Sequence, residues 1–372
     1  MKRIVFINET CGNGSHGRIC LSLAKEFEAE GYEAKIAFGR TGVVPEEARK
    51  YAVRIGNGFS VRLHALYTRL FDKHGFGSYF ATKRFLKWLD SYNPDIVWLH
   101  NLHGYYINIS LLFSWLKLDK NRRLTIRWTL HDCWAFTGHC SHFSYIKCGK
   151  WKNHCNNCPQ KKRYPKAYID NSFNNFKTKK ALFCGLDNME IYTPSHWLAN
   201  LVRQSFLKAY PITVYKNPID KSVFTFRNSN LREKYGIGER IMLLSVATVW
   251  NDRKGLHDLV ELSKLIDERF VLIIVGLTKK QMHLFSPNVI FIKHISNQFL
   301  LSELYSVSNF LINPSYEETF GMTVAEAQLC GCKPIIYKDT ASEEIITKGF
   351  GVAVEPGSEN IFKAVIKEIA KQ

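Results

Sequence analysis

The sequence contains no long hydrophobic run. Its most apolar stretches, such as Ile241–Trp250, end after about ten residues, roughly half of what a membrane-spanning helix needs. The N-terminus has Lys2 and Arg3 but only four apolar residues behind them, so it lacks the apolar segment of a secretory signal. No internal repeat is visible. We therefore expect a globular protein that is made and kept in the cytosol.

Acidic residues are scarce. The 372 residues include 33 Asp and Glu against 51 Lys and Arg, a formal net charge of +18. This excess favours anionic partners such as nucleic acid, an acidic membrane surface or a phosphorylated substrate. It is concentrated in residues 141–186, where ten Lys or Arg accompany one acid, Asp170. No helix-turn-helix or RNA-recognition motif is present, so nucleic acid is not the expected partner.

The N-terminal half alternates between strand and helix patterns. A buried strand at Arg3–Asn8 precedes a glycine-rich loop, an amphipathic helix expected at Arg18–Glu30 and a strand at Glu33–Phe38. Strand, glycine loop, helix and strand form a Rossmann-type opening. Further strands are expected at Ile96–His100, Leu124–Leu130 and Ile191–Thr193. Helical stretches between them predict a parallel, doubly wound sheet.

The same alternation restarts near residue 240. A helix is expected at Leu256–Asp267, and a last one at Glu359–Lys371. Strands are expected at Ile241–Ala247, Phe270–Val275, Val289–Ile292, Phe310–Asn313 and Lys333–Tyr337. The sequence thus predicts an α/β fold of two Rossmann-like domains, residues 1–216 and 217–372, with a Cys-rich insert at about 138–166 in the first.

One short segment combines two carboxylates with a helix start. Glu318 and Glu326 lie eight residues apart, and Gly321 comes just before a helix expected to begin near Met322. Free N–H groups at a helix start can hold a phosphate. A sugar nucleotide needs contacts to its sugar, diphosphate and ribose, and this segment offers one group for each. The alternative is an ordinary solvated helix start with two surface acids.

Residues 315–336 resemble the signature of family 4 glycosyltransferases. The resemblance implies the glycosyltransferase B fold, in which two Rossmann-like domains face each other across a cleft, and a retaining reaction that requires no catalytic metal or other cofactor. It implies that Glu326 contacts the donor ribose and that Glu318 lies near the donor sugar or its leaving oxygen. Phe320 and Gly321 would line the diphosphate.

A basic turn at residues 250–255 also matches this family. The resemblance implies that Lys254 holds the donor diphosphate. The family's arginine normally comes five residues before the lysine, where this chain has Val249, so Arg253 is taken as its substitute. Fixed cations stabilise the charge that develops on a departing nucleoside diphosphate. The alternative is a basic turn that caps a helix.

The N-terminal half contributes a glycine loop and a histidine. Residues 12–18 resemble the loop that faces the diphosphate in this family, which implies roles for Gly14 and Ser15. His131 matches the family histidine that contacts the transferred sugar. His100 and His103 also follow a strand end, but a histidine there is more often structural.

The resemblance therefore implies a glycosyltransferase of bacterial surface-polysaccharide assembly. Its donor would be a UDP- or GDP-sugar and its acceptor a glycan or a lipid-linked glycan. An enzyme of this kind would work in the cytoplasm, with a peripheral place on the inner face of the membrane. The alternatives are a zinc-stapled, basic nucleic-acid-binding protein and a nucleotide-sugar epimerase on the same fold.

Ten cysteines occur in a chain expected to be cytosolic, where disulfides are rare. Cys140, Cys148, Cys155 and Cys158 have the spacing Cys-x7-Cys-x6-Cys-x2-Cys. Four thiolates can hold a structural zinc and staple a loop that has no core of its own. His139, His142 and His154 are alternative ligands, and an iron–sulfur cluster or free thiols are alternative interpretations. In the following basic run, Phe173, Phe176 and Phe183 are either core residues or membrane contacts.

Overall fold

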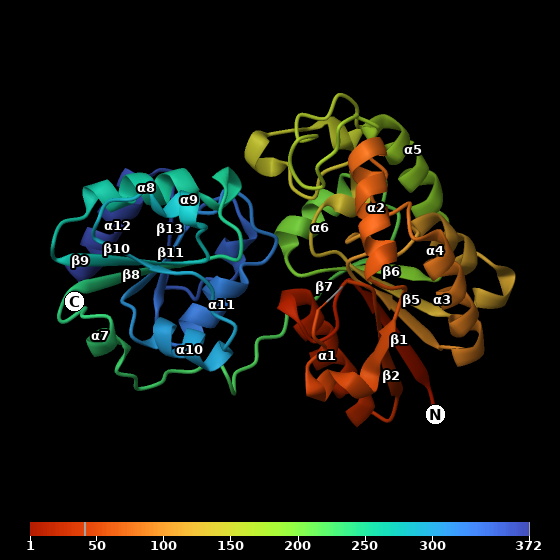
Figure 1. Cartoon of the computed structure of the whole chain (residues 1–372), viewed down its shortest axis with the longest axis horizontal. Coiled ribbons are helices and arrows are strands. Elements are labelled where there is room, and N and C mark those ends of the chain that lie inside the picture. Colours follow the sequence, from red (N-terminus) through yellow and green to blue (C-terminus); the bar gives the residue numbers. More distant parts are fainter. Residues whose placement is uncertain (41, 372) are drawn as a thin grey trace. The chain divides into compact units, whose positions relative to one another are not determined.

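The computed structural model describes residues 1–40 and 42–371 (Figure 1). Its contacts divide the chain into two compact units, residues 1–218 and residues 219 onward. The division falls close to the boundary expected at residue 217. Within the described residues, no helix is long and apolar enough to cross a membrane.

The first unit contains a sheet of seven parallel strands in the order β3-β2-β1-β4-β5-β6-β7. These strands are β1 (Arg3–Asn8), β2 (Glu33–Phe38), β3 (Ala52–Arg54), β4 (Ile96–Leu99), β5 (Thr125–Thr129), β6 (Met189–Thr193) and β7 (Ile212–Val214). The predicted doubly wound parallel sheet is confirmed. The edge strands β3 and β7 were not predicted, because three residues are too few to show a hydrophobic period.

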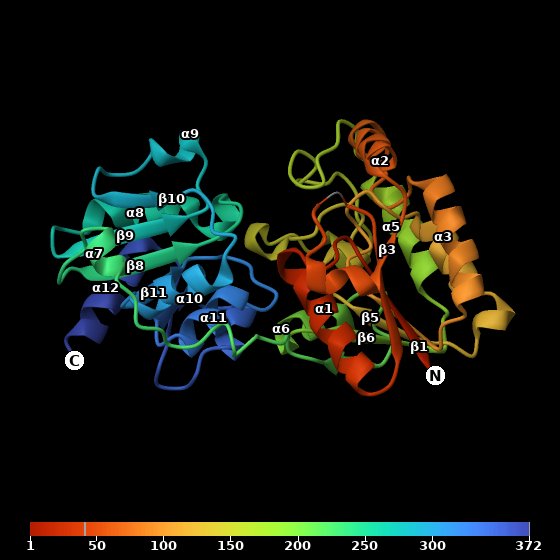
Figure 2. The same cartoon turned by 60° about the horizontal axis from the view of Figure 1, so that its bottom comes forward.

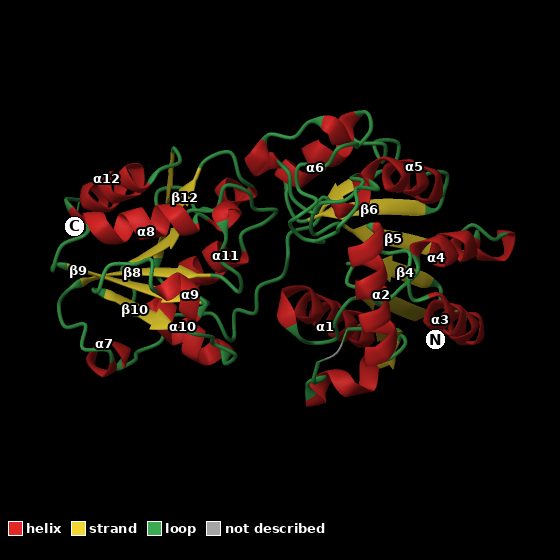
Figure 3. Ribbon diagram, turned by 45° about the horizontal axis from the view of Figure 1, so that its top comes forward, coloured by secondary structure: helices red, strands yellow, loops and turns green. Residues whose placement is uncertain are grey.

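Helices cover both faces of this sheet (Figure 3). They are α1 (Gly14–Ala29), α2 (Gly58–Phe71), α3 (Tyr79–Tyr92), α4 (Ile109–Leu116), α5 (Ser172–Phe183) and α6 (His196–Arg203). Helix α1 packs Ile19 and Leu23 against Phe6 on one face. Helices α3 and α4 pack on the opposite face, where Leu89 and Phe113 join the larger core.

Helix α1 begins at Gly14, four residues before the expected Arg18. The prediction was wrong because it counted the second half of the glycine-rich segment as loop, since glycine is a poor helix former. Asn13 provides the extended residue ahead of the helix. Gly14 and Ser15 therefore form the first turn of α1, where backbone N–H groups have no partner within the helix.

The second unit contains six parallel strands in the order β10-β9-β8-β11-β12-β13. They are β8 (Ile241–Val246), β9 (Phe270–Val275), β10 (Val289–Ile292), β11 (Phe310–Asn313), β12 (Lys333–Tyr337) and β13 (Val352–Val354). The expected bounds of β9 to β12 are confirmed. Its helices are α7 (Leu231–Lys234), α8 (Leu256–Leu265), α9 (Lys279–Met282), α10 (Gln298–Ser306), α11 (Met322–Leu329) and α12 (Ser358–Ile369).

Two hydrophobic clusters lie on opposite faces of this second sheet. Helices α8 and α12 pack together on one face (Figure 3), through side chains such as Leu259 and Val365. Helices α10 and α11 cover the other face, through Leu304 and Val324. The result is a second doubly wound α/β unit.

Both strand orders reverse direction once, between β1 and β4 and between β8 and β11. At such a point the connections leave the carboxyl edge of the sheet towards opposite faces, which opens a crevice there. The carboxyl ends of these four strands are therefore where a ligand site is expected in each unit.

Helix α2 is anchored to the first unit by a buried histidine. The ring of His64 accepts hydrogen bonds at Nε2 from the N–H groups of Gly75 (3.2 Å) and Gly77 (3.0 Å). Its Nδ1 lies 3.0 Å from Oγ of Ser78. Burial lowers the pKa of His64 to about 4, so the ring stays neutral while it accepts these bonds.

Acidification is expected to destabilise the fold through His64. Below pH 6.5, the ordinary pKa of histidine, His64 is protonated in the unfolded chain. In the folded chain it stays neutral until the pH falls to about 4. Each pH unit in this window costs about 1.4 kcal/mol in the free energy of unfolding. Urea unfolding between pH 7 and 5 should show a shallower pH dependence for His64→Gln, whose amide oxygen accepts the same bonds without titrating. The exposed-site variant His257→Gln is the control, and equal slopes for His64→Gln and the parent would contradict the assignment.

Candidate active site

In the second unit the site lies at the carboxyl ends of β8 and β11. The turn after β8 carries Arg253 and Lys254, and the loop after β11 carries Glu317 and Glu318. Gly255 lets the two segments meet: its φ is +72°, and a Cβ there would come within 2.1 Å of the carbonyl oxygen of Pro314. The side chains expected to act together are thus brought together by the strand order.

Lys254 and Glu318 form an ion pair, with Nζ donating to Oε1. Burial is the largest influence on Lys254 and lowers its pKa, although Glu318 opposes the shift. Burial would raise the pKa of Glu318, but the charges of Lys254 and Arg253 outweigh it and the pKa is lowered. The pair therefore consists of a carboxylate and an ammonium in a poorly solvated place, where a further anion would interact strongly.

The Arg253 side chain bonds the backbone of the loop after β11 rather than a carboxylate. Its Nη1 donates to the carbonyl oxygen of Glu317 (2.7 Å), and its own carbonyl oxygen accepts from the N–H of Tyr316 (2.9 Å). These bonds fix the β11 loop to the basic turn. The position of the family arginine, Val249, is exposed. Arg253 is therefore the arginine of this turn that lies beside Glu318.

Helix α11 begins at the expected Met322, directly after Gly321, whose φ is +99°. Phe320 and Glu326 are buried, and Glu326 accepts a hydrogen bond from the hydroxyl of Tyr305 (3.3 Å). Among the described residues, Ser342 has a buried Oγ with no hydrogen-bond partner, 2.5 Å from where a Cβ on Gly321 would lie. Ser342 was not predicted, because nothing in the sequence marks a serine about twenty residues away.

In the first unit three histidines meet at the carboxyl ends of the central strands. Nδ1 of His100 lies 3.0 Å from Nε2 of His131, and the rings of His16 and His131 are 4.4 Å apart. Asn101 bonds the ring of His16 at 2.6 Å. Burial, followed by the nearby charge of His16, lowers the pKa of His100 to about 3 and that of His131 well below its usual range. Neutral imidazoles of this kind can bond hydroxyl groups, as a sugar contact requires.

A second, charged pair lies beside these rings. His103 and Asp132 are joined at 2.8 Å between Nε2 and Oδ2. Burial opposes the charge on His103, but Asp132 outweighs it and the pKa of His103 is raised. His103 and His100 follow one strand end, so the structure brings both into the group around His131, although the sequence favoured structural roles for them.

Glu9, at the carboxyl edge of the sheet in the first unit, was not predicted from the sequence. It follows β1 directly, and Arg40 donates to it at 3.3 Å. Burial alone would raise its pKa, but the hydrogen bond from His16 and the charges of His103, His16 and Arg40 lower it to about 2. Its place immediately after the first strand is the signal that could have identified it.

The four predicted cysteines line one small pocket together with His139. The hydrogen bond from the Cys140 thiol lowers the pKa of Cys158, whereas burial raises the pKa of Cys155 to about 11. Nevertheless, within residues 1–40 and 42–371 no group of three or more His, Cys, Asp or Glu side chains is arranged to hold a metal ion. The zinc site stays a prediction.

The basic run after these cysteines is only partly a solvated face. Phe176 and Phe183 are buried, which confirms the core interpretation for them, whereas Phe173 is exposed. Lys179 is 1% exposed and donates from Nζ to the carbonyl oxygens of Trp134 (2.7 Å) and Thr137 (3.1 Å). Lys179 therefore belongs to the interior of the unit, where backbone carbonyl oxygens take the place of water around its ammonium group.

The curated relatives match only parts of the chain. A putative colanic acid biosynthesis glycosyl transferase, WcaC of Escherichia coli (strain K12), is 32% identical over 117 residues, which are 31% of this chain and 28% of that protein. The O-antigen chain mannosyltransferase RfbU of Salmonella typhimurium is 27% identical over 223 residues, which are 55% of this chain and 57% of that protein. The matched regions thus span less than two thirds of either relative.

Solved structures resemble the whole chain. The sucrose-phosphate synthase of Thermosynechococcus elongatus has a TM-score of 0.69 at 14% identity, covering 100% of this chain and 90% of that one. Anabaena HepE, in complex with UDP and glucose, has a TM-score of 0.67 at 14% identity, covering 99% and 90%. WaaG, a glycosyltransferase of lipopolysaccharide biosynthesis, has a TM-score of 0.64 at 15% identity, covering 99% and 90%. At these identities the likeness shows the fold, that of the glycosyltransferase B class.

Two family models account for most of the sequence. The model described as "Glycosyl transferases group 1" matches residues 228–372, the half that carries the Lys254–Glu318 pair. The model described as "Glycosyltransferase Family 4" matches residues 16–223, more than half of the chain, including His131 and the cysteine segment. The expected resemblance is confirmed, and the chain belongs to glycosyltransferase family 4.

Proposed function

We propose that this protein is a retaining glycosyltransferase that moves a sugar from a nucleotide-sugar donor onto a glycan or a lipid-linked glycan. The observation that carries the proposal is the Lys254–Glu318 pair, held by Arg253 at the start of α11. The donor would be a UDP- or GDP-sugar, and the product a bacterial surface polysaccharide. HepE, which was solved with UDP-glucose, and the mannosyltransferase RfbU support a donor of this class.

The second unit would hold the donor. Lys254 and Arg253 would stabilise the diphosphate, together with the N–H groups at the start of α11 next to Phe320 and Gly321. Glu326 would bond the ribose, releasing the weak bond from Tyr305. Glu318 would position the sugar or its leaving oxygen. Because Lys254 is poorly solvated, its charge would act strongly on the oxygen that becomes negative as the sugar leaves.

The first unit would hold the acceptor and contact the transferred sugar through His131, with Gly14 and Ser15 at the start of α1 near the phosphates. The acceptor hydroxyl would attack the anomeric carbon from the face on which the diphosphate departs. The bond from that carbon to the diphosphate oxygen breaks as the new glycosidic bond forms. The diphosphate oxygen would take the proton of the acceptor hydroxyl, so no side-chain nucleophile is needed.

The place of action would be the cytoplasm, at the inner face of the membrane, where lipid-linked acceptors are presented. Family membership favours this proposal over the nucleic-acid-binding alternative. A nucleotide-sugar epimerase on the same fold differs in one respect that can be measured, because it changes its donor with no acceptor present.

The proposed reaction is tested first by donor binding and product stereochemistry. A panel of UDP-, GDP- and other nucleotide sugars should raise the melting temperature of the purified chain for one base selectively. With that donor, proton NMR of the product should show the anomeric configuration of the donor. An inverted configuration would exclude the retaining mechanism, and conversion of the donor without acceptor would favour the epimerase.

Removal of the Lys254 charge should affect turnover more than folding. Lys254→Ala is expected to lower kcat by about a hundredfold or more, because the leaving diphosphate loses a fixed cation. Lys264→Ala removes an exposed lysine of the same unit and serves as the matched control. Wild-type turnover in Lys254→Ala would refute the assigned role.

We also propose that Cys140, Cys148, Cys155 and Cys158, which are not arranged to hold a metal in this structure, move together and bind one structural zinc. Their convergence on one pocket supports this proposal, and a small segment gains stability from a metal cross-link. Metal analysis of protein purified with zinc in the growth medium should give about one zinc per chain. Cys155→Ser should lose the metal, whereas Cys184→Ser, outside the cluster, should keep it. A metal-free parent protein that unfolds normally would overturn the proposal.

A further inference from the structure

Helix α2 has its polar side inward and its apolar side outward. All of its residues are described, and the two that are buried, His64 and Thr68, are polar. Large apolar side chains occupy the exposed side: Phe59, Leu63, Leu66, Tyr67, Leu70 and Phe71. A surface helix that faces water normally has the opposite arrangement. An exposed apolar stripe of this size indicates a partner surface.

The polar underside explains why the helix folds in this orientation. His64 accepts two backbone hydrogen bonds from the loop that follows α2, and Ser78 bonds its other nitrogen. Asp72, at the C-terminal end, bonds His139 and the N–H of Asn171 (3.0 Å). These polar contacts hold α2 over the unit, together with Val61, which packs against the core. The exposed apolar side chains of α2 are not part of that core.

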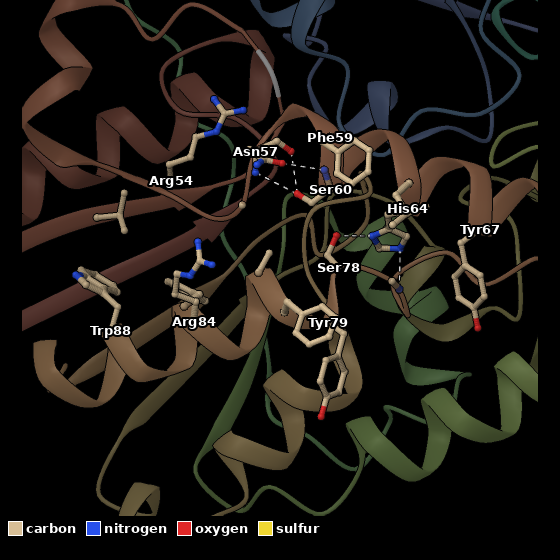
Figure 4. A pocket seen from close by; sticks show the side chains of 17 residues that line it. Arg54, Asn57, Phe59, Ser60, His64, Tyr67, Ser78, Tyr79, Arg84 and Trp88 are labelled. Carbon is tan, nitrogen blue, oxygen red and sulfur yellow. Dashed lines mark hydrogen bonds between the residues drawn. The ribbon is translucent and has the colours of Figure 1, made fainter.

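A groove of about 900 Å³ continues this surface between α2 and the start of α3. Figure 4 shows Phe59, His64 and Tyr67 on α2 on one side of it, and Tyr79, Arg84 and Trp88 on α3 on the other. Phe59 is 74% exposed and Phe80, the second residue of α3, is 81% exposed. In Figure 2, α2 stands outside the layers that cover the sheet. We refer to α2 and the start of α3 as the α2–α3 surface.

The charge of the α2–α3 surface has one sign. Residues 54–88 include seven Lys or Arg and one acid, Asp72. Asp72 is buried, so it does not offset this charge at the surface. Six of the cations are exposed: Arg54, Arg62, Arg69, Lys83, Arg84 and Lys87. Apolar side chains ringed by cations, with no exposed acid, complement a surface that is apolar inside and anionic at its border.

We propose that the α2–α3 surface docks on an anionic lipid bilayer. Phe59, Phe80 and the leucines of α2 enter the boundary between headgroups and acyl chains, and the surrounding arginines and lysines bind lipid phosphates. A protein interface fits less well, because lysine is depleted in such interfaces. Here Lys83 and Lys87 are exposed on α3, on the same helix as the groove residue Arg84.

This inference extends the membrane placement in the proposed function and moves the contact to a different segment. The basic run at residues 161–180, suspected from sequence, has buried Phe176 and Phe183 and a buried Lys179. Its exposed apolar side chains are Tyr164, Tyr168, Ile169 and Phe173. Three of these four lie in a loop, whereas those of α2 form a row along one helix. The test below does not measure sugar transfer, so the failure of the docking proposal and that of the proposed function are distinguishable.

The experiment is co-sedimentation of the full chain with vesicles of phosphatidylcholine, with and without phosphatidylglycerol. Binding is expected to the anionic vesicles and to weaken with added salt. The double variant Phe59→Ser, Phe80→Ser should bind these vesicles at least about tenfold more weakly, because two large apolar groups no longer leave water. Arg62→Glu with Arg84→Glu should weaken binding to anionic vesicles in the same direction.

The matched control is Phe226→Ser with Phe299→Ser, which removes two exposed phenylalanines of the second unit. It should bind like the parent, and thermal unfolding should show that all variants are folded. Absence of binding to anionic vesicles, or equal binding by the Phe59, Phe80 variant, would overturn the proposal. The proposal would also be overturned if the parent chain self-associated without binding vesicles and the Phe59, Phe80 variant did not self-associate. The surface would then be assigned to contact with a second copy.

Discussion

The parallel arrangement of strands is the constraint on which the rest of this structure depends. Parallel strands place all their carboxyl ends on one edge of a sheet, and the connections between them have to cross a face through a helix. Where the order reverses, between β8 and β11, the turn bearing Lys254 and the loop bearing Glu318 emerge side by side. Residues 64 positions apart thereby meet in an ion pair. The glycine at 255 permits this approach, since any larger residue would collide with Pro314.

Burial has opposite effects on charge at the carboxyl edges of the two sheets. In the first unit, burial keeps His100 and His131 neutral, which suits hydrogen bonding to hydroxyl groups. In the second, the ion pair leaves Glu318 a carboxylate beside a poorly solvated ammonium. A low-dielectric surrounding penalises an isolated charge and strengthens a paired one. The same physical effect thus prepares one edge for uncharged hydroxyl groups and the other for an anion.

The outer surface of the first unit is determined by the polar contacts that hold α2. Helix α2 is held by polar contacts from His64 and Asp72, so its apolar residues are free to face outward. The exposed cations and the absence of an exposed acid in residues 54–88 give this part of the unit an apolar and basic surface. With the proposed lipid-linked acceptor, such a surface would bring the acceptor site close to its substrate.

The sequence by itself determined the two α/β units and most strands, because buried parallel strands are near-continuous apolar runs that need no tertiary information. It also singled out Glu318, Gly321 and Lys254 from compact local motifs, and the structure joins Lys254 and Glu318 in an ion pair. It did not identify the start of α1, the three-residue edge strands, Glu9 or Ser342, since none of these has a local pattern. The inversion of α2 is of the same kind: an apolar stripe predicts a helix face, but only the neighbours that His64 and Asp72 find in the folded chain decide that this face points outward. Periodicity is a property of the local chain, whereas burial and ionisation depend on residues brought together from distant parts of it.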